Sequence, residues 1–201
     1  MQKFTLVVPV KSLDVAKSRL EVGTDRHALA LAFAQDALAA ALNAKRVRQV
    51  FVVTADPTLS AAARTGGAVV LPDEGDGDLN EVLRAAAGRL PHGSHVAAMC
   101  ADLPCLTAEE LDQALAQVPA HGQGFVPDAD DTGTTLLATH DVAAFSPQFG
   151  VGSRAAHLRV GAHEIARECA RLRRDVDTAA DLATALYLGV GPYTESVLKK
   201  A

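Results

Sequence analysis

The sequence predicts an α/β fold, in which a sheet is flanked by helices. Short apolar runs bounded by turn residues recur along the chain, and longer segments rich in alanine and leucine lie between them. That alternation is typical of strands connected by helices. The length of 201 residues and the hydrophobic content of 49% fit one buried core. We therefore assign residues 1–201 to a single domain, with 191–201 as a tail.

The predicted strands are short runs rich in apolar and β-branched residues. In chain order they are Thr5–Val10, Gln49–Thr54, Ala68–Leu71, His95–Met99, Gly124–Pro127 and Thr134–Thr139, with a last extended segment at Arg171–Val176. An acidic turn, 128–131, separates the fifth strand from the sixth. Because ligands of open α/β sheets bind outside the carboxyl ends of the strands, the residues that follow each strand are candidates for chemistry.

The predicted helices have apolar residues at helical spacing or begin at a capping residue. They are Arg26–Leu42, Leu59–Arg64, Leu79–Leu90, a helix opened by Thr107 that runs to Gln117, one from Ser153 to about Cys169, and one capped by Thr178 that runs to Leu188. Thr107, with Glu110 three residues later, has the form of a capping box. We also expect Ser153 to cap its helix.

Composition excludes several classes of protein. A net charge of -5 argues against nucleic-acid binding, which needs a clustered excess of lysine and arginine. The first apolar run, Phe4–Val10, is too short to cross a bilayer and has no cleavage site after it, so we expect no membrane contact and no targeting. Cys100, Cys105 and Cys169 form no C-x-x-C pair, which favours a reducing compartment, the cytoplasm.

Three cations follow the first predicted strand within one short loop: Lys11, Lys17 and Arg19. At the carboxyl end of a strand, such a cluster suits a triphosphate. The loop lacks the Gly-x-x-x-x-Gly-Lys pattern of a Walker A motif. A solvated basic turn is the alternative interpretation, since charge runs are commonly exposed faces.

Asp102 follows the fourth predicted strand, where its carboxylate would hold Mg²⁺ against phosphate oxygens. One carboxylate is enough as an anchor, because Mg²⁺ takes one or two protein carboxylates together with substrate phosphates. Asp175 or Asp177 would face the metal from the other side of the cleft, and we choose Asp177. Capping of a helix or turn is the alternative for each of these residues.

Two glycine-containing loops are candidate anion sites, Gly133-Thr134-Thr135 and Gly150-Val151-Gly152-Ser153. Glycines let backbone N–H groups approach a phosphate or carboxylate, and Ser153 would begin a helix with a positive dipole end. His157 lies on the same predicted helical face as Ser153 and would touch an anion, although a packed or an exposed histidine is the commoner outcome. Two tight turns are the alternative interpretation.

The segment 72–80 is acidic and rich in glycine, but its carboxylates do not match the spacing of a calcium loop. We therefore predict no calcium site there. Asn80 lies in the first turn of the following helix, where its side chain would hydrogen-bond a base or a ribose. A flexible acidic turn is the alternative.

The ordered set of these loops resembles the guanylyltransferases of coenzyme F420 biosynthesis, which act on 2-phospho-L-lactate or phosphoenolpyruvate. The resemblance covers nearly the whole chain. Its motifs are Val8-Pro9-Val10-Lys11, Ala16-Lys17-Ser18-Arg19-Leu20, Gly77-Asp78-Leu79-Asn80, Ala101-Asp102-Leu103-Pro104, Gly133-Thr134-Thr135-Leu136-Leu137, Phe149-Gly150-Val151-Gly152-Ser153 with His157, and Asp175-Val176-Asp177-Thr178 with Asp181-Leu182.

This resemblance implies a Rossmann-like nucleotidyltransferase fold of the glycosyltransferase-A type, with a mixed, mostly parallel sheet. It also implies GTP and Mg²⁺ as reactants and pyrophosphate as the leaving group. The implied catalytic residues are Lys17, Arg19 and Asp102, the last also being the metal ligand. The resemblance further places Lys11 and Asn80 at the nucleotide and Thr135, Gly150 and Ser153 at the acceptor acid.

The acceptor is inferred from one departure from the family pattern. Many members that act on phospholactate read Gly-Thr-Asn where this chain has Thr135 in the third position. Members similar to this chain act on phosphoenolpyruvate, so we expect enolpyruvyl-diphospho-guanosine as product and its hand-over to the next transferase of the pathway. The alternatives are 2-phospho-L-lactate or 3-phosphoglycerate as acceptor, and a non-catalytic nucleotide-binding module of the same fold.

Overall fold

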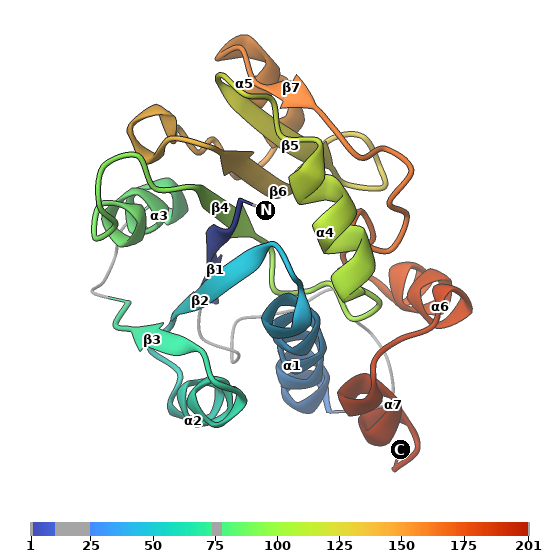
Figure 1. The fold of residues 1–201 in the computed structure, drawn as a ribbon. Helices are drawn as coiled ribbons and strands as arrows, with labels where there is room; N and C mark the ends of the chain where they lie inside the picture. The colour runs from blue at the N-terminus through green and yellow to red at the C-terminus, as the bar shows by residue number, and fades with distance from the viewer. Residues whose placement is uncertain (1, 11–24, 74–77, 201) are drawn as a thin grey trace.

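The computed structural model describes residues 2–10, 25–73 and 78–200. Within them, a seven-stranded sheet has the order β3-β2-β1-β4-β6-β5-β7 (Figure 1). Its strands are β1 (Phe4–Pro9), β2 (Val47–Val53), β3 (Val69–Leu71), β4 (Val96–Met99), β5 (Gln123–Pro127), β6 (Thr134–Thr139) and β7 (His163–Glu164). All neighbouring strands are parallel except β6, which is antiparallel to both β4 and β5. The predicted mixed, mostly parallel α/β sheet is confirmed.

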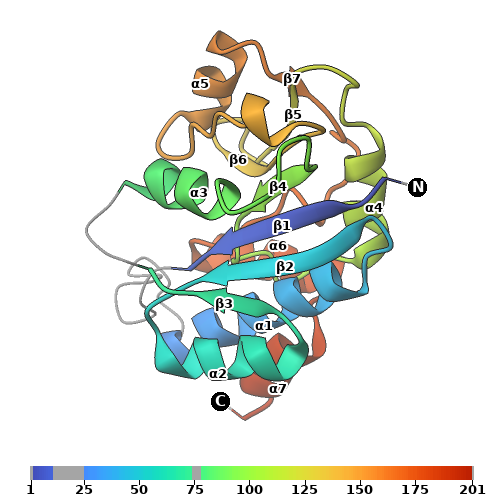
Figure 2. The same ribbon diagram turned by 60° about the vertical axis from the view of Figure 1, so that its left-hand side comes forward.

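Helices cover both faces of the sheet. They are α1 (Arg26–Asn43), α2 (Pro57–Gly66), α3 (Leu79–Ala87), α4 (Ala108–Ala116), the 3-10 helix η1 (Val142–Ala144), α5 (Ser153–Arg159), α6 (Ala179–Leu188) and α7 (Pro192–Leu198). Figure 2 shows α3 on one side of the sheet and α1 and α2 on the other. None of the helices in the described ranges is long and apolar enough to reach across a membrane.

The alternation of side chains along β1 explains why both faces are covered. Leu6 and Val8 belong to the apolar cluster that includes buried residues of α1, α2 and α4, whereas Val7 belongs to the cluster that includes α3 and Phe145. All three valine and leucine side chains are fully buried. A strand buried on both faces is a continuous apolar run, which is why this segment was readily recognised in the sequence.

The helix that begins at Ser153 is much shorter than predicted. It ends at Arg159, and the chain then turns through Gly161, whose φ is +80°. The next residues, His163 and Glu164, form β7 beside β5. The prediction that Ser153 caps this helix is also wrong, because Gly152 is the N-cap and Ser153 is the first helical residue.

The capping box predicted at α4 is only half formed. The Thr107 hydroxyl accepts a hydrogen bond from the Glu110 N–H at 3.2 Å. The Glu110 carboxylate does not return to Thr107, because it accepts from the N–H groups of Arg171 and Leu172, both at 2.9 Å. This tertiary contact holds the segment 171–176, which we predicted to be extended and which forms no strand.

The C-terminal segment that we predicted to be a tail contains α7, which packs against α1. Asp36 of α1 is 4% exposed, and its carboxylate accepts hydrogen bonds from the N–H groups of Tyr193 and Thr194 at 3.0 and 2.9 Å. A Cβ atom at Gly191 would overlap this carboxylate. Asp36 therefore acts as the missing side-chain cap of α7, from a residue more than 150 positions earlier in the chain.

We predict that Asp36→Ala lowers the free energy of unfolding by about 2 kcal/mol, because the buried N–H of Thr194 and the part-buried N–H of Tyr193 lose their carboxylate acceptor. Asp36→Asn retains one oxygen acceptor and should lose less. Urea unfolding of the two variants beside the wild type measures the difference. An unchanged midpoint for Asp36→Ala would show that α7 does not depend on this cap.

Candidate active site

The candidate site lies at the carboxyl edge of the sheet. Parallel strands β1, β4 and β5 end at this edge, and the antiparallel strand β6 begins there. The Cys100 N–H donates to the Thr135 carbonyl oxygen at 2.9 Å, which places the start of β6 beside the residues that follow β4. Asp102 and Thr135, which are far apart in sequence, are therefore brought to the same edge.

Carboxylates gather at this edge around Asp175. The Val176 N–H donates to the Asp102 carbonyl oxygen at 3.1 Å, so the segment that carries Asp175 lies against the loop after β4. The pKa of the half-buried Asp175 carboxyl is raised to about 7, first by burial and then by the negative charges of Asp102, Asp128 and Asp177. Such mutual repulsion marks a place where a cation would be bound favourably.

Asp175 is better placed than Asp177 to share a cation with Asp102. The Asp175 side chain is half-buried among these carboxylates, whereas Asp177 is exposed and its N–H donates to Asp181 at 3.3 Å. Asp181 also completes a capping box with Thr178 at the start of α6. The role of Asp177 as metal ligand stays a prediction.

Asp128 shapes the turn that leads into β6. Its carboxylate accepts hydrogen bonds from the N–H groups of Thr132 and Gly133 at 2.9 and 2.6 Å. A Cβ atom at Gly133 would overlap this carboxylate, so the turn requires glycine. No role was predicted for Asp128, although it directly follows a predicted strand. Applying the strand-end rule to every strand would have identified it.

His157 is packed inside the protein and binds two neighbouring segments. It is fully buried, its Nδ1 lies 2.9 Å from the Thr134 hydroxyl, and its Nε2 accepts from the Gln148 N–H at 3.0 Å. Because Nε2 is an acceptor, Nδ1 of the uncharged ring carries the hydrogen and donates to Thr134. Burial lowers the pKa of His157 to about 4. Both ring nitrogens are thus used internally.

A candidate anion site is indicated by donors that lack partners. The Thr135 hydroxyl is fully buried and has no hydrogen-bond partner in the part of the chain that is described. The N–H groups of Gly150, Val151 and Gly152 also donate to no acceptor within the described ranges. Gly150 and Gly152 have φ values of +130° and +70°, which glycine adopts without strain. The Thr135 hydroxyl is buried, and a buried donor without a partner is costly unless a ligand binds it. Residues 150–152 are exposed, so their N–H groups are open to a ligand or to water.

The nucleotide side of the site is only partly described. Lys11, Lys17 and Arg19 lie outside the described residues, so their roles stay predictions. The Asn80 side chain has internal contacts. Its Nδ2 donates to the Phe149 carbonyl oxygen at 2.9 Å, and its Oδ1 accepts from the Phe149 N–H at 2.7 Å. The predicted contact of Asn80 with guanosine also stays a prediction.

The residues at this edge fit a magnesium ion that substrates help to bind. In the described ranges, no three carboxylate, histidine or cysteine side chains surround one point as a complete metal site would. Mg²⁺ does not need such a set, because it binds through one or two carboxylates and takes its other ligands from phosphates and water. Asp102 and Asp175 meet that requirement.

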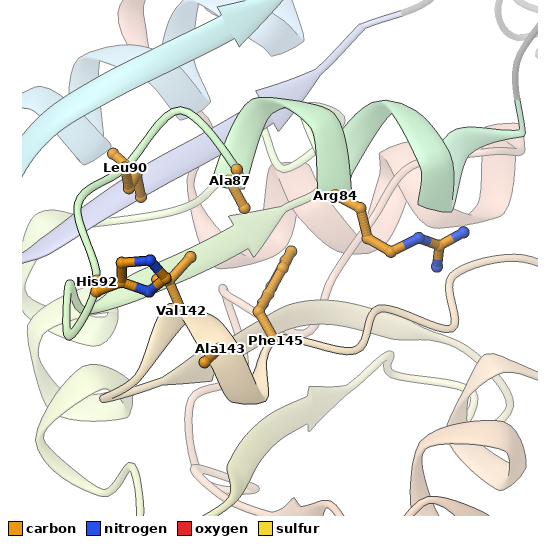
Figure 3. A pocket seen from close by; sticks show the side chains of 8 residues that line it. Arg84, Ala87, Leu90, His92, Val142, Ala143 and Phe145 are labelled. Carbon is orange, nitrogen blue, oxygen red and sulfur yellow. The ribbon is translucent and has the colours of Figure 1, made fainter.

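Two cavities lie away from this edge. One of about 330 Å³ lies between α3 and η1, with Ala87, Leu90 and Phe145 in its lining (Figure 3). The other, of about 580 Å³, lies between α1 and α2 and is also lined by Tyr193. Their linings include no residue that the sequence predicted for the site, so we assign the chemistry to the sheet edge.

Comparison with known sequences finds a matching family model and similar curated proteins. The family model described as guanylyl transferase CofC like matches residues 4–201. Two similar curated proteins are named phosphoenolpyruvate guanylyltransferase. The protein from Thermomonospora curvata is 48% identical, with 96% of this chain and 88% of that protein aligned. The protein from Streptomyces avermitilis is 47% identical, with 96% and 92% aligned.

Comparison with solved structures shows the fold. A protein from Desulfovibrio desulfuricans G20, described as a nucleotide-diphospho-sugar transferase, has a TM-score of 0.69 at 19% identity and covers 100% of this chain and 95% of its own. A nucleotidyl transferase from Methanothermobacter has a TM-score of 0.63 at 14% identity, covering 94% and 98%. The Rossmann-like nucleotidyltransferase fold predicted from the sequence is confirmed.

Proposed function

The chain belongs to the CofC-like guanylyltransferase family, and from this premise we propose that it transfers GMP from GTP to the phosphate of phosphoenolpyruvate. The products are enolpyruvyl-diphospho-guanosine and pyrophosphate. The name shared by the similar curated proteins supports phosphoenolpyruvate as the acceptor. The observation that carries the proposal is the buried, unpartnered Thr135 hydroxyl on the strand beside the loop that carries Asp102.

The acceptor would bind to Thr135, Ser153 and the loop residues 150–152 that precede Ser153. A phosphorylated three-carbon acid carries two anionic groups that accept hydrogen bonds from hydroxyl and backbone N–H donors. The free N–H groups of residues 150–152 and the Thr135 hydroxyl supply such donors. Ser153 is 2% exposed and Thr135 is fully buried, whereas residues 150–152 are exposed, so the acceptor would bind between buried hydroxyl groups and an exposed loop.

The acceptor phosphate is its own nucleophile. Its second ionisation lies near pH 6, so it is largely dianionic at neutral pH and needs no general base. A phosphate oxygen forms a bond to the α-phosphorus of GTP, and the bond from that phosphorus to the bridging oxygen of the β-phosphate breaks. The enzyme must therefore bring two anions together in line and reduce their repulsion.

Positive charge at the reacting phosphates would come from two sources. We propose that Asp102 and Asp175 hold Mg²⁺, which supplies charge neutralisation when bound. The predicted triphosphate loop contributes Lys17 and Arg19. Asp102 and Asp175 would hold the cation together, because they lie on segments joined by the hydrogen bond from the Val176 N–H to the Asp102 carbonyl oxygen.

The proposal also covers the setting of the reaction. Cys100, Cys105 and Cys169 form no disulfide within the described residues, which agrees with a reducing compartment such as the cytoplasm. Hand-over of the product to the next transferase of coenzyme F420 biosynthesis belongs to the same proposal.

The decisive experiment offers GTP and Mg²⁺ with phosphoenolpyruvate, 2-phospho-L-lactate or 3-phosphoglycerate in separate reactions. Released pyrophosphate is counted and the product mass is measured, with the next transferase present as a trap for a labile product. We expect the highest kcat/KM with phosphoenolpyruvate. A preference for 2-phospho-L-lactate would reassign the acceptor. If no pyrophosphate is released with any of the three acids, a non-catalytic nucleotide-binding module would be favoured.

We predict that Asp102→Ala lowers kcat by about 10²–10³-fold, since a preorganised charge at the reacting centre is lost. The fold should persist, because Asp102 lies in a half-buried loop at the edge of the sheet. Asp130→Ala is the matched control, as Asp130 is an exposed carboxylate of the nearby acidic turn. Near-normal turnover in Asp102→Ala would remove this residue from the mechanism.

A further inference from the structure

The acceptor pocket is built from three segments that one buried side chain joins. His157 belongs to α5, which begins at Ser153. Its Nδ1–H donates to Thr134, the neighbour of Thr135 on β6, and its Nε2 accepts from Gln148, two residues before Gly150. Each segment that carries a predicted acceptor residue is therefore attached to the same imidazole ring.

The orientation of the ring is fixed by its packing. Phe125 belongs to β5, and the centroid of its ring lies 5.3 Å from that of the His157 ring. The centroid of the Phe149 ring lies 5.4 Å from that of His157, and these two rings are nearly perpendicular. A neutral imidazole has one donor and one acceptor that point in different directions, and both are satisfied here.

Asn80 contacts the loop that precedes Ser153 at a second point, Phe149. Its amide makes a two-way hydrogen-bonded pair with the backbone of Phe149, which directly precedes Gly150. The Asn80 Nδ2 also donates to Asp78, the N-cap of α3, at 3.3 Å. The loop is thus joined to α3 through Asn80 and to β6 and α5 through His157.

We infer that His157 and Asn80 are positioning residues that hold the 145–152 loop in its acceptor-binding shape before the acceptor arrives. This inference rests on the proposed function. It differs from the nucleotide contact predicted for Asn80 and from the anion contact considered for His157, for which a packed or exposed histidine was the commoner alternative. Preorganisation of a binding loop raises affinity by removing the cost of ordering it on binding. A loop displaced by about 1 Å can lower activity by about 100-fold.

Three variants of His157 separate its two contacts. His157→Asn keeps an N–H near the Nδ1 position for Thr134 but loses the acceptor for Gln148. His157→Gln keeps an oxygen near the Nε2 position for Gln148 but loses the donor to Thr134. His157→Leu loses both. We expect the KM for phosphoenolpyruvate to rise about 10-fold in the first two variants and about 100-fold in the third, with the KM for GTP within about 2-fold of the wild type.

Asn80 provides the sharper test, because its two possible roles change different parameters. As a positioning residue, Asn80→Ala raises the KM for phosphoenolpyruvate and leaves that for GTP nearly unchanged. Asn80→Asp keeps the acceptor for the Phe149 N–H and should lie between Asn80→Ala and the wild type. A rise confined to the KM for GTP would show that Asn80 binds the nucleotide and would overturn its part of the inference.

Controls distinguish positioning from general damage. His163→Gln changes an exposed histidine of β7 and should leave both KM values unaltered. Thermal unfolding identifies variants that fail to fold, and ¹⁵N NMR of the wild type at pH 7 should show His157 with an unprotonated Nε2. A protonated Nε2 would contradict the contacts on which the inference stands.

The outcomes also separate this inference from the proposed function. If the wild type releases no pyrophosphate with any of the three acids, the proposed function fails. If the wild type turns over phosphoenolpyruvate but folded His157 variants lose only kcat, or raise both KM values equally, the positioning role fails and the proposed function stands.

Discussion

Asp175→Asn is expected to stabilise the metal-free protein while lowering its activity by about 10²–10³-fold. Burial and the neighbouring carboxylates raise the pKa of Asp175 to about 7, from an ordinary value of 3.8. The folded protein therefore holds this proton more tightly than the unfolded chain does. Between these two pH values the unfolded chain is ionised while the folded site stays protonated, so stability falls as pH rises toward 7 and remains lower above it.

Asparagine removes this penalty because it cannot ionise. Three pKa units correspond to about 4 kcal/mol, so we expect a gain of about 2–4 kcal/mol for the metal-free variant at pH 8 and almost none at pH 4. The loss of activity follows from the loss of a carboxylate that would hold Mg²⁺ beside Asp102. Active sites commonly combine low stability with function in this way.

The measurement is urea unfolding in EDTA at pH 4 and pH 8, together with pyrophosphate release at saturating Mg²⁺. Asp177→Asn is the matched control, since Asp177 is exposed two residues away and was the metal ligand predicted from the sequence. We expect little change in its stability. Loss of activity in Asp177→Asn with full activity in Asp175→Asn would support the sequence-based prediction and remove Asp175 from the metal site.

The parts of the fold that depend on local sequence were predictable. The helix over residues 26–43 and the strand over 4–9 are continuous apolar patterns, and each was predicted to within a residue or two. The strand-end rule placed Asp102 at the carboxyl edge of the sheet. It did not place Thr135, which reaches the same edge because β6 is antiparallel to β4 and begins there.

The parts that depend on distant partners were not predictable in this way. The Glu110 carboxylate has the spacing of a capping box but binds residues 171 and 172. The helix at 192–198 has no polar cap in its own sequence, because its cap is Asp36. A single sequence does not show which side chain approaches from elsewhere in the fold. For the same reason, the sequence alone does not show which of Asp175 and Asp177 is buried beside Asp102.

The second large effect is a loss of stability in acid that depends on His157. Burial of the ring lowers its pKa to about 4, whereas the unfolded chain titrates near 6.5. Below pH 6.5 the unfolded state therefore binds more protons than the folded state, and stability falls as pH decreases from 6.5 toward 4. The shift of about 2.5 units corresponds to about 3 kcal/mol.

The wild type alone would hide this effect, because Asp175 contributes with the opposite sign over an overlapping pH range. We therefore compare the unfolding free energies of the wild type and His157→Gln at each pH from 4 to 8. Asp175 contributes equally to both proteins and cancels in the difference. The stability of the wild type relative to the variant should decrease by about 3 kcal/mol from pH 7 to pH 4. A difference that is independent of pH would mean that the imidazole is not held uncharged between Thr134 and Gln148, and the geometry assigned to the acceptor loop would lose its basis.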